Sequence, residues 1–210
     1  MKNYWHKRIN IPKYIAKKIN TIISESKEII ETLTLENNNK ICLLEVEPSL
    51  FSKVFAQNRK YLYHGDYTSP ADVNDYANCR CFLTNNGLAG FAVSNDGWLT
   101  SLFSNLNCKG FLQSVKKVIN QYATKLECFC TGNLSESKLI KLYEDLGFQI
   151  CAKTKDDRND MIEYYGDEFV RNFTQYYGVP YHVFMIASNK KIRQIKIFDN
   201  YYVAHEYIKK

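Results

Sequence analysis

The sequence predicts an α/β fold of the α+β kind, with a mixed, mostly antiparallel central sheet flanked by helices. Two periodicities predict it, because apolar residues recur every three or four positions in some segments and every second position in others. A third observation is the turn Asn95-Asp96-Gly97, which separates two strand-like segments and predicts an antiparallel hairpin. At 210 residues the chain suits one domain with additions at both ends.

Residues 1–36 are predicted to form a helical extension before that domain. Residues 11–33 place isoleucines and a leucine at helical spacing, and Pro12 suits a first helical turn. We expect the apolar face of this helix to pack on the rest of the chain or on a second subunit, which makes a homodimer one expected form. Lys40–Val46 then alternates as the first strand, and residues 48–57 follow as a helix.

The middle of the chain contains the hairpin and the elements after it. Residues 88–94 and Trp98–Ser104 are the two predicted strands, with the turn at Gly97 between them. A helix is predicted from Phe111, and residues 126–131 form the next strand. The apolar face of that helix consists of Phe111, Val115, Val118, Ile119 and Tyr122.

The segment L-Y-E-D-L-G-F at 142–148 predicts a helix that ends on a glycine and passes directly into a strand. Gly147 supplies the left-handed residue that ends the helix, and Phe148, Ile150 and Ala152 alternate after it. Asn133 is the predicted N-cap of this helix, with Glu136 completing a capping box. The predicted apolar stripe is Leu139, Leu142, Tyr143 and Leu146.

This motif and the order of the elements before it resemble the GNAT family of N-acetyltransferases, from about residue 80 to residue 155 and more loosely to the strand at 183–186. The resemblance implies a domain over 37–188, with a C-terminal extension over 189–210. It also implies transfer of an acetyl group from acetyl-coenzyme A to an amine of a protein, an aminoacyl-tRNA or a small molecule. The later half is most similar in pattern to acetyltransferase-like proteins of phages and mobile elements, which implies a host-directed role as one option.

The resemblance also implies where acetyl-coenzyme A would bind. Its pyrophosphate would lie at the turn before the predicted helix at Phe111, where backbone N–H groups and the helix dipole attract anions. The pantetheine arm would pair with backbone groups of the preceding strand. Only Gly110 fits the usual phosphate motif, because Asn105 and Cys108 depart from it. The cofactor residues implied are Leu102, Phe103, Ser104, Asn107, Cys108, Lys109, Gly110, Phe111, Asn133 and Leu139.

For the chemistry, Tyr143 matches the tyrosine that lies beside the sulfur in the family. A tyrosine hydroxyl keeps its proton at neutral pH and can donate a hydrogen bond or a proton to the departing thiolate. The general base stays open. Glu127 is one candidate, and Asp96, His64, Asp66 or a water molecule are the others.

Composition limits the remaining functions. A net charge of +6 suits an acidic ligand but does not establish nucleic-acid binding. The absence of a long apolar run and of a signal-like N-terminus predicts a cytoplasmic protein with no membrane contact. The seven cysteines are expected to be reduced, with the two C-x-C pairs in the core, and no metal site is predicted. The alternative to an enzyme is a catalytically inactive GNAT-like protein that binds partners through its surface.

Residues 59–78 are rich in turns and tyrosines. The resemblance implies that this region helps to cover the acceptor site. A surface loop with half-buried tyrosines explains the same composition equally well.

Overall fold

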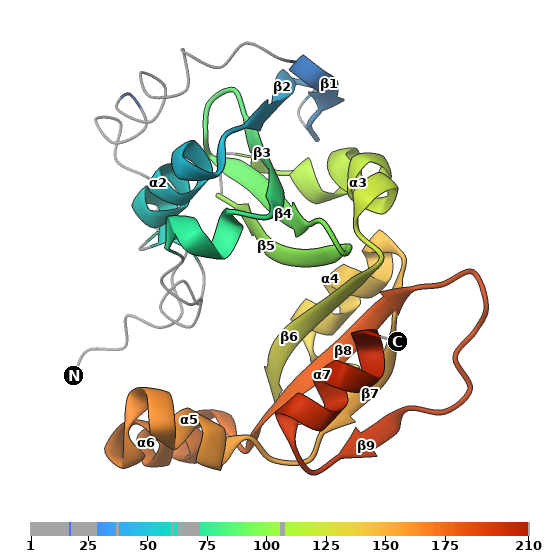
Figure 1. Cartoon of the computed structure of the whole chain (residues 1–210). Helices are drawn as coiled ribbons and strands as arrows, with labels where there is room; N and C mark the ends of the chain where they lie inside the picture. Colours follow the sequence, from blue (N-terminus) through green and yellow to red (C-terminus); the bar gives the residue numbers. More distant parts are fainter. Residues whose placement is uncertain are drawn as a thin grey trace. The chain divides into compact units, whose positions relative to one another are not determined.

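The structure is a computed structural model that describes residues 17, 29–36, 38–59, 61–62, 72–105 and 108–209 (Figure 1). The chain divides into two compact units, Met1–Tyr122 and Ala123–Lys210. Both units combine strands with helices, so the predicted α/β class with a mostly antiparallel sheet is confirmed. Among the described residues, no helix has the length and apolar character that crossing a bilayer requires.

The first unit contains a sheet in which strands that follow each other in sequence are also neighbours in space. Every pair is antiparallel, and the hairpin between the last two strands turns at Gly97, whose φ is 87°. Positive φ values suit glycine, which explains the residue at this turn. The strands, in their spatial order, are β1 (Ile29–Thr34), β2 (Lys40–Val46), β3 (Cys79–Thr84), β4 (Ala89–Ser94) and β5 (Trp98–Ser104).

Helices α2 (Pro48–Arg59) and α3 (Phe111–Tyr122) pack on this sheet through aromatic side chains. Phe55 of α2 contacts Phe103 of β5, with ring centroids 5.3 Å apart. Tyr122 of α3 stacks on Phe82 of β3 at 5.3 Å. Residues of a strand alternate between the two faces, and the partner of Phe82 in β4 is Phe91, whereas the partner of Phe103 is Gly90. The two helices therefore cover opposite faces, and the core of the unit lies on both sides of the sheet.

The predicted N-terminal helix is wrong over its last residues, because Ile29–Thr34 forms strand β1. The sequence I-I-E-T-L-T is rich in β-branched residues, which favour a strand, and β1 pairs with β2 so that Leu33 faces Ile41. Leu33 is buried, whereas Ile29 is exposed. Before residue 29 the structure describes only Lys17, which is helical, so the rest of the predicted helix lies outside the described residues.

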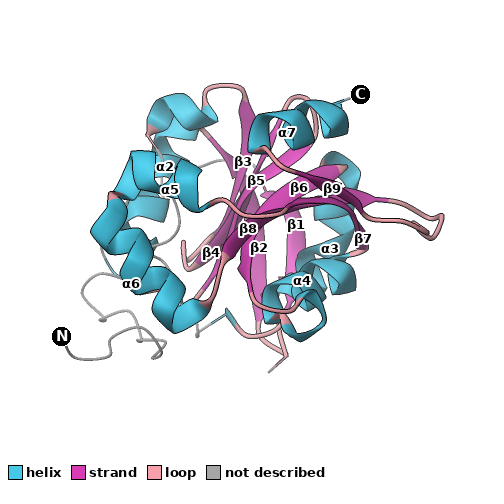
Figure 2. Ribbon diagram, turned by 90° about the horizontal axis from the view of Figure 1, so that it is seen from below, coloured by secondary structure: helices cyan, strands magenta, loops and turns pink. Residues whose placement is uncertain are grey.

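The second unit has a different strand order, β6-β8-β7-β9. Strand β8 lies between β6 and β7 and is antiparallel to both, and β9 is parallel to β7. Two helices form a hairpin between β7 and β8 (Figure 2). The strands are β6 (Lys125–Thr131), β7 (Phe148–Thr154), β8 (Pro180–Ala187) and β9 (Lys196–Phe198), and the helices are α4 (Lys138–Leu146), α5 (Arg158–Tyr165), α6 (Asp167–Tyr177) and α7 (Tyr201–Lys209).

The start of α4 differs from the prediction. Asn133 accepts a hydrogen bond from Ser135 N and caps a short 3₁₀ helix, Leu134–Glu136, instead of α4. Ser137 is the N-cap of α4 and accepts from Ile140 N. The predicted capping box of Asn133 with Glu136 is therefore wrong for α4, because the 3₁₀ turn places four more residues between the cap and the helix. The end is as predicted, with Gly147 left-handed at φ 106°.

The buried face of α4 also differs by one position. Leu139, placed on the predicted apolar stripe, is 39% exposed, whereas Ile140 and Leu146 are buried. The other predicted elements are confirmed, since the segments at 40–46, 48–57, 88–94, 98–104 and 126–131 and the helix from Phe111 all occur with bounds within two residues. All seven cysteines are free thiols. Of the two C-x-C pairs predicted to lie in the core, Cys128 and Cys130 are both buried, whereas in the other pair Cys81 is buried and Cys79 is half-buried.

Candidate functional site

Tyr143 lies on α4, and its hydroxyl environment includes the two thiols of β6. Cys128 and Cys130 are two apart in the strand, so both face α4, with sulfur atoms 3.9 Å apart. Contact with Cys130, together with burial, raises the pKa of the Cys128 thiol. Burial, and then the proximity of these two cysteines, raises the pKa of Tyr143 well above its ordinary value. The tyrosine hydroxyl therefore keeps its proton and can act only as a neutral hydrogen-bond donor or acceptor.

The turn before α3, which the sequence assigns to the pyrophosphate, is packed against the end of β1. Gly110 has φ +84°, and a Cβ atom added there would lie 2.7 Å from Glu36 N. Glu36 N donates to the carbonyl oxygen of Lys109 at 3.3 Å. Gly110 is thus required by the fold itself, because both its conformation and its close neighbour exclude a side chain.

The other described side chains at this turn differ in their exposure to solvent. Cys108 is buried, which raises the pKa of its thiol to about 11. Its carbonyl oxygen accepts from Ser104 Oγ at 3.3 Å. Lys109 is exposed and Phe111 is buried, so Lys109 is the side chain here that can meet an anion in solution. Asn107 lies outside the described residues.

The backbone of β5 pairs with β4 through the residues predicted to hold the pantetheine arm. Leu102, Phe103 and Ser104 lie opposite Phe91, Gly90 and Ala89. This pairing uses one edge of β5, and the side chain of Phe103 is buried against α2.

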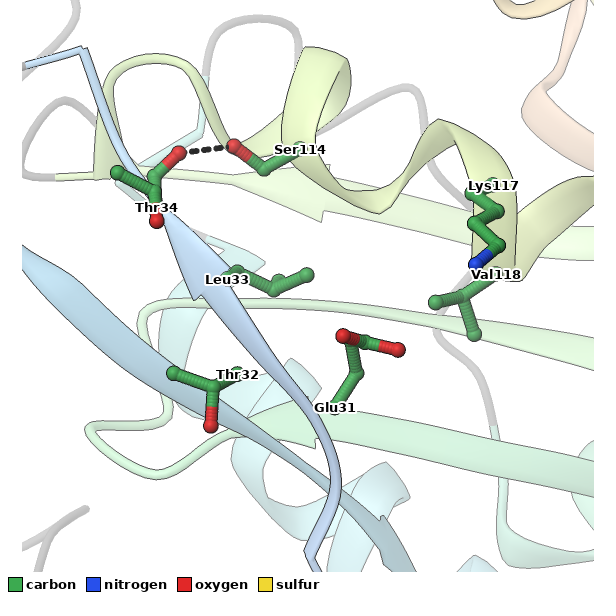
Figure 3. A pocket seen from close by; sticks show the side chains of 7 residues that line it. All are labelled: Glu31, Thr32, Leu33, Thr34, Ser114, Lys117 and Val118. Atoms are coloured by element: carbon green, nitrogen blue, oxygen red, sulfur yellow. Dashed lines mark hydrogen bonds between the residues drawn. The ribbon is translucent and has the colours of Figure 1, made fainter.

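A shallow pocket in the first unit lies between β1 and α3 (Figure 3). Its volume is about 230 Å³. Ligand sites for small molecules usually measure roughly 300–1,000 Å³. None of the residues predicted to bind the cofactor lines it; the lining consists of Glu31, Thr32, Leu33, Thr34, Ser114, Lys117 and Val118. The pocket is therefore too small for a coenzyme and is not the predicted site.

Glu127, the first candidate for a general base, lies on the face of β6 opposite to the two cysteines. Tyr201 of α7 donates its hydroxyl hydrogen bond to both carboxylate oxygens, at 3.0 and 2.9 Å. Asp96 is in the exposed hairpin turn and accepts from Ser94 Oγ at 2.5 Å. His64 and Asp66 lie outside the described residues.

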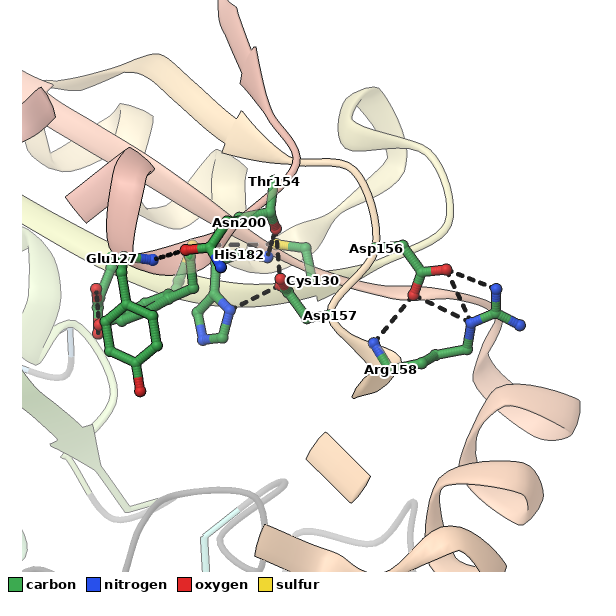
Figure 4. A network of polar contacts seen from close by, with 11 residues as sticks. Glu127, Cys130, Thr154, Asp156, Asp157, Arg158, His182 and Asn200 are labelled. Atoms are coloured by element: carbon green, nitrogen blue, oxygen red, sulfur yellow. Dashed lines mark hydrogen bonds and ion pairs between the residues drawn. The ribbon is translucent and has the colours of Figure 1, made fainter. Parts of the chain in front are cut away.

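The same face of the second unit carries a histidine–carboxylate pair that the sequence did not reveal (Figure 4). His182 of β8 approaches Asp157 with a distance of 2.7 Å between Nδ1 and Oδ2. Thr154, the last residue of β7, donates from Oγ1 to the same Oδ2 at 2.7 Å. The backbone N–H of His182 in turn donates to Thr154 Oγ1 at 2.8 Å. The three residues form a closed set of hydrogen bonds.

The two partners differ in burial. The side chain of Asp157 is 1% exposed, and its second oxygen, Oδ1, is buried with no hydrogen-bond partner in the part of the chain that the structure describes. The side chain of His182 is 25% exposed. Its ring packs edge-on against Phe129 and Tyr201, with centroids 5.4 and 4.8 Å away. A buried carboxylate therefore holds a histidine whose ring still reaches the surface.

Sequence patterns could not find this pair. His182 and Asp157 are separated by 25 positions, and neither belongs to a short motif. They meet because β8 pairs with β7 and because the Asp157 backbone N–H donates to Pro180 O at 2.9 Å, at the beginning of β8. In the described part of the chain, no three His, Cys, Asp or Glu residues gather as a metal ion would require.

Comparisons with protein-family models, with curated proteins and with solved structures find no match for this chain. Function is therefore inferred from the residues and their geometry.

Proposed function

We propose that the protein is an N-acyltransferase that uses acetyl-coenzyme A as acyl donor and an amine as acceptor. The observation that carries the proposal is the position of Tyr143, on a helix that ends at Gly147 and leads directly into β7, with its hydroxyl near Cys128 and Cys130. The order of elements that the resemblance implies, from the β4–β5 hairpin through α3 and β6 to α4, supports it.

In this proposal Tyr143 stabilises the departing thiolate by a hydrogen bond. Thiols ordinarily have a pKa of about 8.5. The pKa of Tyr143 is raised well above the ordinary tyrosine value. Transfer of the whole proton from Tyr143 to sulfur is therefore uphill, whereas a hydrogen bond costs no charge separation. Water then supplies the proton to the thiolate.

The residues at the predicted pyrophosphate turn fit the donor in part. Lys109 is exposed and would contribute positive charge, and the N-terminus of α3 follows directly. Glu36, whose backbone packs on Gly110, limits the approach from its side. Lys109 and the first turn of α3 are therefore the groups that would meet the phosphates.

Ligand binding is tested first by thermal unfolding with and without acetyl-coenzyme A. A ligand at 100 times its dissociation constant stabilises the folded protein by about 2.7 kcal/mol. Desulfo-coenzyme A and ATP serve as controls, because they separate recognition of the whole donor from recognition of its nucleotide. No stabilisation at millimolar acetyl-coenzyme A contradicts the proposal.

Catalysis is tested with Tyr143→Phe in a transacetylation assay over amines of proteins, aminoacyl-tRNA and small molecules. Loss of one donor to the transition state lowers turnover by roughly 10- to 1,000-fold with little effect on donor binding. Tyr181→Phe is the matched control, because Tyr181 also has a raised pKa, of about 12, owing first to burial, but donates its hydroxyl to Gly132 O at 2.8 Å. Equal turnover of Tyr143→Phe and the wild type would remove Tyr143 from the mechanism.

The second candidate function is a binding protein of the same architecture without catalysis. The contact between Glu36 and Gly110 favours it, because this contact explains the glycine without any ligand. Both experiments distinguish the two functions. A binding protein without catalysis would show no stabilisation by acetyl-coenzyme A in thermal unfolding and no transfer to any amine in the transacetylation assay.

A further inference from the structure

We infer that Cys130 is a nucleophile of the proposed acyl transfer and carries the acetyl group as a thioester before it passes to the amine. The inference rests on the proposed function and adds a covalent step to it. It is carried by a cluster of side chains between β6 and α4, in which Cys130 contacts Cys128 and Ser137 and shares a face of β6 with Tyr143.

The contacts of Ser137 determine where its hydroxyl hydrogen points. As the N-cap of α4, its Oγ accepts from Ile140 N at 3.3 Å. The same Oγ lies 3.8 Å from Cys130 Sγ. A serine hydroxyl has one hydrogen and two lone pairs, so it can accept from the backbone and donate elsewhere at the same time. Ser137 therefore directs a hydrogen-bond donor at the sulfur of Cys130.

Cys128 supplies a second donor to Cys130. The two sulfur atoms are 3.9 Å apart. Because Ser137 also donates to Cys130, both donors are used when Cys130 is a thiolate and Cys128 keeps its hydrogen. The hydrogen bond from Cys128, and after it that from Ser137, lowers the pKa of Cys130 although burial opposes the change. Cys130 is therefore the sulfur of the pair that ionises first.

The position of Cys130 at the N-terminus of α4 favours the same ionised form. Its contact with Ser137 places the sulfur beside the first turn of a nine-residue helix. The N–H groups of a first turn have no partners within the helix, and the helix dipole is positive there, so a nearby thiol loses its proton more readily. The thiolate is the form of cysteine that attacks a carbonyl carbon. An isolated buried thiol would instead keep its proton.

The other C-x-C pair of the chain shows that the motif alone does not produce this arrangement. Cys79 and Cys81 are also two apart in a strand, β3. Among the described residues, the sulfur of Cys79 contacts Asp75 O and Thr100 Oγ1, and that of Cys81 contacts Cys79 O. Burial raises the pKa of both thiols, that of Cys81 to about 12. Cys81 is therefore a matched buried thiol that its neighbours keep protonated.

The proposed reaction has two balanced steps. In the first, the Cys130 thiolate forms a bond to the acyl carbon while the bond from that carbon to the coenzyme A sulfur breaks, and the electron pair goes to that sulfur, which Tyr143 hydrogen-bonds. In the second, the unprotonated amine nitrogen forms a bond to the same carbon, the bond to Cys130 breaks, and the electron pair returns to Cys130. The surplus proton on nitrogen passes to water. Donor and intermediate are both thioesters, so the first step needs no further reactant.

The burial of the cluster limits the class of acyl group. Cys130 is 4% exposed, and Cys128 and Ile140 beside it are buried as well. A long acyl chain would have to displace these packed side chains, which is costly in a dense core, whereas a short chain requires little displacement. We therefore expect acetyl- and propionyl-coenzyme A to acylate Cys130 and long-chain acyl-coenzyme A to fail.

The experiment measures covalent labelling in the absence of an acceptor. The full chain is mixed with acetyl-coenzyme A in a buffer without amines, and mass spectrometry of the intact protein and its peptides locates added acetyl groups. We expect one acetyl group on Cys130, which neutral hydroxylamine removes as it removes a thioester, and an equal amount of free coenzyme A thiol. Cys81→Ala should keep the label. Cys130→Ala and the closer mimic Cys130→Ser should lose it, because a serine hydroxyl without a base is a weak nucleophile.

Transfer to an amine gives a second readout. Initial rates at varied donor and acceptor concentrations should follow ping-pong kinetics, the pattern of a covalent intermediate. Cys130→Ser should lower kcat by roughly 1,000-fold or more, as loss of a nucleophile does, and Cys81→Ala should leave it unchanged. Circular dichroism of each variant confirms that it is folded.

Cys128→Ala and Cys128→Ser test the positioning role of Cys128 through a pH profile. The rate at which iodoacetamide alkylates Cys130 follows the thiolate fraction, so its midpoint should lie at a higher pH in Cys128→Ala than in the wild type. Cys128→Ser keeps a donor and should restore part of the difference. An unchanged midpoint in Cys128→Ala would overturn the role of Cys128.

The outcomes separate this inference from the proposed function. If the wild type acetylates an amine, forms no acetyl-Cys130 and loses no turnover in Cys130→Ser, the nucleophile is overturned and the proposed function stands. A label that persists in Cys130→Ala lies on another residue and overturns the nucleophile as well. A wild type that acetylates neither itself nor any amine would overturn both.

Discussion

Replacement of Gly110 by alanine is expected to destabilise the first unit by an amount that the structure predicts. The residue has φ +84°, and its missing Cβ would lie 2.7 Å from Glu36 N and 2.8 Å from Glu36 Cγ. Backbone atoms cannot move aside as the end of a flexible side chain can. Either the turn before α3 or the end of β1 must therefore shift.

Two costs contribute to the change in the free energy of unfolding. A left-handed residue with a Cβ costs about 1–2 kcal/mol. Relief of a tight contact by a backbone shift costs about 1–3 kcal/mol more. We therefore expect Gly110→Ala to lose about 2–5 kcal/mol, and Gly110→Val to lose more because a β-branched side chain is less tolerant of this conformation.

Urea unfolding followed by far-UV circular dichroism measures this loss, with Gly132→Ala as the matched control. Gly132 has φ +67°, but a Cβ there would meet nothing within 4 Å. It should lose only the conformational part, about 1–2 kcal/mol. Equal losses for the two alanine variants would refute the close contact of Glu36 with Gly110. A loss of affinity for acetyl-coenzyme A in Gly110→Val therefore has two causes. The turn before α3 is displaced, and the valine side chain blocks the approach of the phosphates.

Three further predictions concern the fold. Ser137→Ala should destabilise the protein by about 1 kcal/mol in urea unfolding and Asn133→Ala by less, because Ser137 caps α4 whereas Asn133 caps a short 3₁₀ turn; the reverse order would restore Asn133 as the cap of α4. Asn58→Ala should cost about 1–3 kcal/mol, since the buried amide donates to two carbonyl oxygens, both at 2.9 Å, and a loss near zero would mean that water replaces it. Glu45→Gln should cost at most about 1 kcal/mol at pH 7, because the pair with Arg80 is partly exposed. The hydrogen bond from Arg80 holds the pKa of Glu45 below its ordinary value, so this difference should be present above that value and disappear as the pH falls through the lowered pKa; a difference that persists in acid would exclude the ion pair as its cause.

Elements with a strong local signal were predictable from the sequence. The hairpin of β4 and β5 follows from alternating residues around Asn-Asp-Gly, and the end of α4 follows from Gly147. Both signals involve only residues that are close along the chain. The helix α3 was predictable for the same reason, because its apolar residues recur at helical spacing over three turns.

Three features were decided only by the tertiary structure. Ile29–Thr34 has apolar residues that fit a helix as well as a strand, and its pairing with β2 selects the strand. Asn133 and Ser137 both have side chains that can cap a helix. Because Asn133 caps the 3₁₀ turn between them, Ser137 is the N-cap of α4. His182, Asp157 and Thr154 come together because β8 inserts between β6 and β7. Strand pairing depends on the free energy of contacts between distant segments, which no local pattern contains. The sequence alone therefore determined the hairpin of β4 and β5, the helix α3 and the end of α4, whereas the tertiary structure decided strand β1, the cap of α4, the strand order and the histidine–carboxylate pair.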